Sequence, residues 1–181
     1  TSRLLDTLRQ RVLFFDGGMG TQIQDRNLTA ADFGGKDGCN DYLSLTRPDV
    51  VEAIHAAYFE AGADIVETNS FQASQLRLDE WGIGEKTFDL NRAAAEIARR
   101  VADRFEQADG RPRFVAGSIG PSGYLPSSED PDLGKMRLEE LVPAFEVQAR
   151  GLVVGGADVL ILETCQDILE MKAQMLAARD A

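Results

Sequence analysis

Short apolar runs alternate with longer amphipathic stretches along the chain. Four runs are rich in β-branched or aromatic residues and are too short to be helices: Val12–Phe15, Ile65–Val66, Phe114–Ala116 and Val159–Leu162. Their starting points lie about 50 residues apart, which leaves room for a loop and a helix between neighbours. This pattern predicts βα units that form a parallel sheet.

Helical periodicity fills the intervals between the runs. Helices are expected from Pro48 to Ala61, from about Phe88 to Phe105, from Leu138 to Val154, and from about Asp167 onward. A proline in the first turn marks the start of one helix, and Gly155-Gly156 marks the end of another. Residues 2–10 are expected to form a short helix within a leading helical segment at residues 1–11.

A repeated sequence supports the βα interpretation. Gly-Ala-Asp at residues 62–64 leads through apolar residues to Glu67, and Gly-Ala-Asp at 156–158 leads to Glu163. The second version is two residues longer, and in a strand two residues preserve the face to which a side chain points. Such half-units are typical of a (β/α)8 barrel. Four units are half of a barrel, so the expected α/β fold is either that half or an open parallel sheet.

Composition restricts the class of protein. The chain has 181 residues, with 19 Lys and Arg against 30 Asp and Glu, for a formal net charge of −11. One domain fits this length, and so acidic a chain is a poor candidate for binding nucleic acid or an anionic membrane. No apolar run is long enough to span a bilayer. Two cysteines indicate no disulfide framework, so a cytoplasmic protein is expected.

Acidic residues follow three of the apolar runs. Asp16, Glu67 and Glu163 each come where a buried strand ends, and an unpaired carboxylate at that depth costs several kcal/mol. Each one alone could cap a helix or pair with an arginine. The carboxyl ends of parallel strands share one rim, however, so the three carboxylates are expected to converge there.

The Gly17-Gly18 turn after Asp16 suggests a ligand for this rim. Its backbone N–H groups could hold a carboxylate, while the acidic side chains could hold an ammonium group, a combination that fits an α-amino acid. A divalent metal ion and an acid/base pair acting on a neutral substrate remain alternatives. Two long insertions on the same side, at residues 25–46 and 120–136, are expected to help build the site.

The other chemically active residues form no recognisable motif. His55 is the only histidine and lies within an expected helix, which favours a structural role and disfavours Ser-His or Cys-His catalysis. Cys39 and Cys165 are far apart in the sequence and do not form a zinc motif.

Five ordered motifs resemble a known family. They are Asp16-Gly17-Gly18-Met19-Gly20-Thr21, Gly38-Cys39-Asn40-Asp41-Tyr42-Leu43, Gly62-Ala63-Asp64 through Glu67-Thr68-Asn69-Ser70-Phe71, Gly117-Ser118-Ile119-Gly120-Pro121, and Glu163-Thr164. In this order they resemble the homocysteine-binding domain of cobalamin-dependent methionine synthases. The resemblance covers the chain from about residue 10 onward and implies a (β/α)8 barrel, of which residues 1–181 would be the N-terminal half.

The resemblance also implies roles for individual residues. Asp16 and Glu163 would hold the homocysteine amino group, and the backbone N–H groups of Gly17, Gly18 and Met19 would hold its carboxylate. Glu67 and Thr68 would line the pocket. The family's zinc ion is bound by three cysteines that come later in the barrel, so this chain is expected to contain no metal ligands, and cobalamin is expected on another domain.

These implications define the expected function. The parent protein would transfer a methyl group from methylcobalamin to a zinc-activated homocysteine thiolate, giving methionine, and the 181 residues alone would be inactive. The expected partners are homocysteine, the rest of the barrel, and the folate and cobalamin domains. Two alternatives stay open: a non-catalytic amino-acid-binding or assembly module, and a metal-dependent α/β lyase or isomerase.

Overall fold

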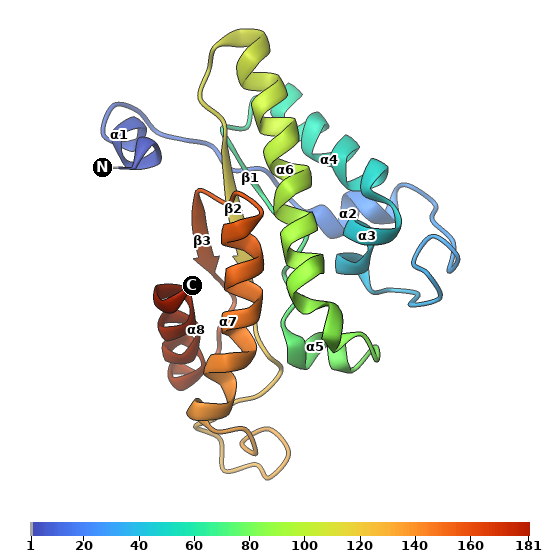
Figure 1. Ribbon diagram of the computed structural model, residues 1–181, viewed down its shortest axis with the longest axis vertical. Coiled ribbons are helices and arrows are strands. Elements are labelled where there is room, and N and C mark those ends of the chain that lie inside the picture. Colours follow the sequence, from blue (N-terminus) through green and yellow to red (C-terminus); the bar gives the residue numbers. More distant parts are fainter. Residues whose placement is uncertain (1) are drawn as a thin grey trace.

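A parallel sheet lies at the centre of the computed structural model, which describes residues 2–181 (Figure 1). Strands β1 (Ile65–Glu67), β2 (Phe114–Ile119) and β3 (Val159–Leu162) pair in chain order. Ile65 is in register with Phe114, and Ala116 is in register with Val159. The expected α/β class with parallel strands is confirmed.

Helices fill the segments between the strands. The α-helices are α1 (Arg3–Leu8), α2 (Met19–Gln24), α3 (Leu43–Thr46), α4 (Pro48–Glu60), α5 (Gln75–Asp79), α6 (Thr87–Asp109), α7 (Leu138–Val154) and α8 (Ile168–Asp180), and two short 3-10 helices are η1 (Asn40–Tyr42) and η2 (Gly84–Lys86). The four long helices confirm the periodicity of the sequence, although α6 extends beyond its expected end. Within residues 2–181, no helix combines the length and the apolar character needed to cross a membrane.

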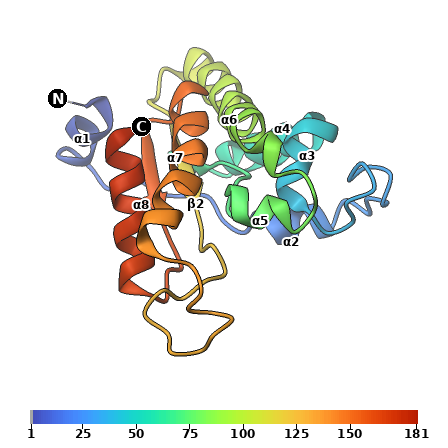
Figure 2. The same cartoon turned by 60° about the horizontal axis from the view of Figure 1, so that its bottom comes forward.

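The long helices pack beside one another in chain order. Helix α6 packs against α4 and α7, and α7 packs against α8, as both views of the chain show (Figures 1 and 2). Gly151 in α7 and Gly155 directly after it permit the close approach of this helix to α6. A Cβ atom at Gly151 would lie 2.7 Å from the carbonyl oxygen of Phe88, and one at Gly155 would lie 2.4 Å from that of Arg92. These contacts hold α7 tightly against α6.

The first expected strand, Val12–Phe15, is wrong in its extent. Only Phe15 forms a parallel bridge, with Ile65, although the N–H groups of Asp64 and Ile65 both donate to the carbonyl oxygen of Phe14. This segment lies at an open edge of the sheet and has a neighbour on one side only. Val12 is 72% exposed and Phe14 is 66% exposed, so burial stabilises the segment little.

The strands are covered on both faces by different clusters. Val66 and Val115 pack toward the helices with residues of α4 and α6. On the inner face, Ile65 and Phe114 pack with Leu4 of α1. Because side chains alternate along a strand, the inner row of each strand continues to its carboxyl end: Ile65 to Glu67, Phe114 and Ala116 to Ser118, and Ile161 to Glu163.

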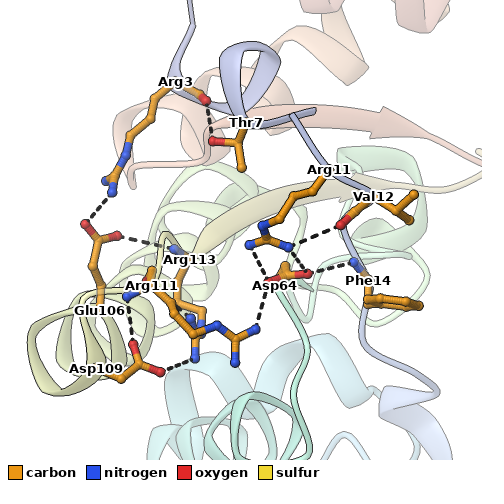
Figure 3. Close-up of polar contacts among 10 residues, drawn as sticks. All are labelled: Arg3, Thr7, Arg11, Val12, Phe14, Asp64, Glu106, Asp109, Arg111 and Arg113. Atoms are coloured by element: carbon orange, nitrogen blue, oxygen red, sulfur yellow. Dashed lines mark hydrogen bonds and ion pairs between the residues drawn. The ribbon is translucent and has the colours of Figure 1, made fainter. Parts of the chain in front are cut away.

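Asp64 fixes the opposite end of β1 (Figure 3). Its side chain is 1% exposed and accepts two hydrogen bonds from the Arg11 guanidinium, at 2.9 and 2.8 Å, and one from the N–H of Phe14 at 3.0 Å. Arg111 adds a contact of 3.2 Å. Burial alone would raise the pKa of Asp64, but the hydrogen bonds and the positive charges of both arginines hold it below its usual value.

Replacing Asp64 by asparagine should destabilise the chain by about 1 kcal/mol near pH 7, because the hydrogen bonds from the partly exposed Arg11 lose their charged acceptor. Since the pKa of Asp64 is lowered by folding, its contribution is present above the pKa of the unfolded chain and is lost as the pH falls through the folded value. Urea unfolding at pH 7 and at pH 3 measures both effects.

Asp6→Asn is the matched control, because Asp6 pairs with Arg9 at 2.9 Å on the exposed surface. Its unfolding midpoint should equal that of the wild type at both pH values. Equal stability of Asp64→Asn and wild type at pH 7 would contradict the role given to Asp64.

Candidate functional site

A cavity of about 390 Å³ opens at the carboxyl ends of the strands. All seven substrate-binding residues expected from the sequence contribute to its lining: Asp16, Gly17, Gly18, Met19, Glu67, Thr68 and Glu163. The rest of the lining consists of Gly20, Gly38, Asn40, Asp41, Asn69, Ser70, Phe71, Gln72 and Ser118. The structure therefore brings together residues from four separate βα units.

The two insertions contribute unequally to this cavity. Residues 25–46 supply Gly38, Asn40 and Asp41 to the lining. Residues 120–136 supply none, so the expectation that both insertions build the site is wrong for the second one. That segment is instead held against α8, where Asp167 accepts hydrogen bonds from the N–H and the hydroxyl of Ser127 at 2.7 and 3.0 Å.

Asp16 connects the first turn to β1. Its Oδ2 accepts a hydrogen bond from the backbone N–H of Glu67 at 3.0 Å. Burial raises the pKa of Asp16 to about 7, and the negative charges of Glu67 and Glu163 act in the same direction. A carboxyl group with this pKa is about half protonated at pH 7, so a bound cation can take the place of its proton.

Glu67 and Glu163 lie close together at the same rim, in the equivalent orientations that the repeated sequence predicts. Burial raises the pKa of Glu67, and the negative charge of Glu163 raises it further. The hydroxyl of Ser118 donates to Oε1 of Glu163. Ser118 thus connects Glu163 to the neighbouring strand β2.

Asp41 is a fourth carboxyl group in the cavity lining. It lies in η1, is 7% exposed, and accepts a hydrogen bond from the N–H of Gln72 at 3.0 Å. Burial raises the pKa of Asp41 to about 6. Because Gln72 follows β1, this bond joins the first insertion to the loop at the end of β1.

Backbone N–H groups form the other polar wall. Within the described residues, the N–H groups of Gly17, Gly18 and Met19 donate no backbone hydrogen bond, since they lie at and before the start of α2. The hydroxyl of Tyr58 donates to the carbonyl oxygen of Gly18 at 3.2 Å and holds this turn against α4. These N–H groups are available to an anion.

The remaining reactive side chains lie outside the lining. His55 is fully buried without hydrogen-bond partners for its ring nitrogens, and burial lowers its pKa to about 4, which keeps it neutral. Burial raises the pKa of both Cys39 and Cys165 to about 11, which favours their thiols over thiolates. Within residues 2–181, no group of three or more His, Cys, Asp or Glu side chains is placed to hold a metal ion.

Comparison with known families decides the classification. The model of the homocysteine S-methyltransferase family matches residues 13–181. The chain belongs to this family. Among curated proteins, this family member is 48% identical over 178 residues to the methionine synthase of Mycobacterium leprae and 47% identical to that of Mycobacterium tuberculosis. Each match covers 98% of the chain, which spans only 14% of the length of these relatives.

Solved structures show the same fold for this homocysteine S-methyltransferase family member. The metallated form of the homocysteine methyltransferase MmuM from Escherichia coli matches with a TM-score of 0.78 and 24% identity, over 98% of this chain and 62% of that one. Its oxidized form matches with a TM-score of 0.77, over 95% and 60%.

Sequence reasoning left Asp41 and Ser118 without a role. Both belong to motifs that carry the family resemblance, but neither directly follows an apolar run as Asp16 and Glu67 do. Strand alternation could have found Ser118, because it lies two residues beyond Ala116 on the inner face. Asp41 comes from an insertion, whose path no periodicity predicts.

Asp16→Asn should stabilise the chain at pH 8 by about 2 kcal/mol and have little effect at pH 4. Because burial raises the pKa of Asp16 to about 7, its ionisation costs stability progressively as the pH rises from the unfolded value of 3.8 through 7. Asparagine keeps an acceptor for the N–H of Glu67 without the charge. Urea unfolding at both pH values measures the change.

Asp25→Asn is the control, because Asp25 is exposed and lies outside the cavity lining. It should unfold with the wild-type midpoint at both pH values. A loss of stability in Asp16→Asn at pH 8 would show that the Asp16 carboxylate is compensated by a partner and would contradict the uncompensated charge.

Proposed function

We propose that this chain binds homocysteine as part of a cytoplasmic methionine synthase that transfers a methyl group from methylcobalamin to homocysteine. The observation that carries the proposal is the charge of the cavity. Four of its sixteen lining residues carry carboxyl groups and none carries a basic side chain. A cavity of this charge binds a cationic group, and the ammonium group of an amino acid is one.

The proposed ligand pose uses both polar walls. Asp16 and Glu163 accept hydrogen bonds from the ammonium group, and Glu67 lies beside them. The N–H groups of Gly17, Gly18 and Met19 donate to the ligand carboxylate. Thr68 contributes surface to the lining. This two-ended grip orients the remaining part of the ligand, its sulfur-bearing side chain, in a fixed direction.

We further propose that residues 1–181 form the N-terminal half of a (β/α)8 barrel, with residues 1–11 as its leading segment. Three strands and the bridged segment at Phe15 lie in chain order, as successive barrel strands do. Both edges are open, and β3 is only partly buried. The proposed partners are the remaining half of the barrel and the folate and cobalamin domains of the parent protein.

The described residues do not fit a zinc site. Cys39 packs in an apolar cluster and Cys165 donates its Sγ–H to the Gln174 side chain at 2.9 Å, and the raised pKa of each favours the neutral thiol. We propose that zinc and cobalamin are held by other parts of the parent protein. In this proposal the present residues bind and orient the amino acid, and activation of its sulfur is not assigned to them.

Binding of homocysteine to the chain tests the proposal directly. Isothermal titration calorimetry at pH 7.5 should detect binding to the wild type. Glu163→Gln should weaken binding at least about tenfold, because a charge-assisted hydrogen bond to the ammonium group is lost. Asp25→Asn, which changes an exposed acid outside the cavity, should bind as the wild type does.

The deaminated analogue 4-sulfanylbutanoate separates the two ends of the ligand. It lacks the ammonium group, so the wild type should bind it more weakly than homocysteine. The Glu163→Gln variant should bind the analogue with the same affinity as the wild type does. Equal affinity of the wild type for homocysteine and for this analogue would refute the proposed pose. Magnesium- or manganese-dependent turnover would instead favour a metal-dependent lyase or isomerase.

The purified 181-residue chain should transfer no methyl group from methylcobalamin to homocysteine, with or without added zinc, because the described residues do not fit a zinc site. Methionine formation, followed by chromatography, is the measurement. The whole parent protein serves as the positive control, and methionine formed by the chain itself would show that this part of the account is wrong.

A further inference from the structure

Ser118 occupies a central position among the acidic residues of the cavity. It is fully buried, lies on the inner face of β2, and donates its hydroxyl hydrogen to Oε1 of Glu163. Hydrogen bonds also hold the backbone of Ser118. The N–H of Ser118 donates to Oγ1 of Thr68 at 3.0 Å, and its carbonyl oxygen accepts from the hydroxyl of Ser70 at 2.8 Å.

These contacts close a ring whose donors can be assigned. A hydroxyl group has one hydrogen to donate, and that of Ser70 goes to the carbonyl oxygen of Ser118. Thr68 must therefore be the donor in the 2.6 Å contact between its hydroxyl and that of Ser70. The hydroxyl of Thr68 then has no hydrogen left for a ligand.

The ring replaces the strand pairing that β1 no longer supplies. Strand β1 ends at Glu67, and the side chains of Thr68 and Ser70 satisfy the backbone of Ser118 beyond that point. Gln148 of α7 ties the ring to the helical layer by donating to the carbonyl oxygen of Ser70 at 2.8 Å. The loop after β1 thus holds the backbone of Ser118, and Gln148 holds that loop, so the position from which the Ser118 side chain extends is fixed.

We propose that Ser118 is a positioning residue, which holds the Glu163 carboxylate in place for the ammonium group of the ligand. Ser118 donates to Oε1 of Glu163, and Glu163 lines the cavity. The inference rests on the proposed function, since it assigns Glu163 to the amino group. It adds a residue that acts on the ligand only through Glu163.

Several titratable groups lie near Glu163, but among the described residues the hydrogen bond to its carboxylate comes from Ser118. Asp16, Glu67 and Asp41 share its cavity and carry the same sign of charge. Cys165 and Glu170 lie on the α8 side, where Glu170 is bonded to Ser122 and the Cys165 thiol to Gln174. The Ser118 hydroxyl is therefore the neutral donor that orients the carboxylate among like charges.

A double-mutant cycle measures whether Ser118 acts through Glu163. Calorimetric dissociation constants for homocysteine at pH 7.5 are compared for wild type, Ser118→Ala, Glu163→Ala and the double variant. Ser118→Ala should weaken binding about tenfold in the wild type, yet less than about twofold when Glu163 is already alanine. An equal loss in both backgrounds would show a merely structural role and overturn the inference.

Ser122→Ala is the matched control. Ser122 is also fully buried, lies four residues further along the chain, and donates its hydroxyl to Oε1 of a glutamate, Glu170, outside the cavity. It should bind homocysteine as the wild type does. Ser118→Thr, which keeps the hydroxyl, should restore affinity to within about threefold, and Ser118→Cys replaces the alanine variant if that one does not fold.

A measurement without ligand keeps the inference separate from the proposed function. Proton NMR of the free chain should show a protected downfield hydroxyl resonance that is lost in Ser118→Ala and in Glu163→Ala but kept in Ser122→Ala. If the wild type shows this resonance but does not bind homocysteine, the proposed function fails and so does the positioning role. If the wild type binds but lacks the resonance, or Ser118→Ala binds unchanged, only the inference fails.

Discussion

Uncompensated negative charge in one cavity is the constraint on which the rest of the structure depends. Four carboxyl groups line the space at the carboxyl ends of the strands without a basic side chain among them. Burial and mutual repulsion raise the pKa of Asp16 and of Glu67, so the free chain carries this arrangement at a cost in stability. Binding sites often keep such destabilising groups because the ligand compensates their charge when it binds. An ammonium group placed between Asp16 and Glu163 would compensate the negative charge of this cavity. The neutral N–H groups at Gly17–Met19 give the same cavity an opposite pole.

The repeated Gly-Ala-Asp sequence explains how the fold holds these carboxyl groups together. At the amino end of β1, Asp64 accepts the N–H of Phe14, and its own N–H donates to the carbonyl oxygen of Phe14. Asp158 makes the same two contacts with Val115 at the start of β3. Each aspartate thereby fixes the register of its strand against the preceding one, and register decides which face the following glutamate occupies. In both copies of the repeat, an aspartate holds the amino end of the strand and a glutamate follows its carboxyl end.

Much of this arrangement could be predicted from sequence, for reasons that are local. The periodicity of α4, α6, α7 and α8 and the alternation along the strands depend on short stretches of chain. The structure has these four helices and brings Glu67 and Glu163 to one cavity. The first strand could not be predicted in its extent, because Val12–Phe15 has an apolar pattern but only one neighbour with which to pair. The unequal contributions of the two insertions depend on tertiary contacts such as that between Asp41 and Gln72. The role of Ser118 depends on a ring of hydrogen bonds between residues far apart in sequence, which no pattern within one strand reveals.

A crystal structure of the chain with bound homocysteine tests the central claim most directly. The account predicts the ligand nitrogen within hydrogen-bonding distance of the Asp16 and Glu163 carboxylates, and the ligand carboxylate at the N–H groups of Gly17, Gly18 and Met19. A ligand bound in the reverse orientation, or at any surface other than this cavity, would contradict it.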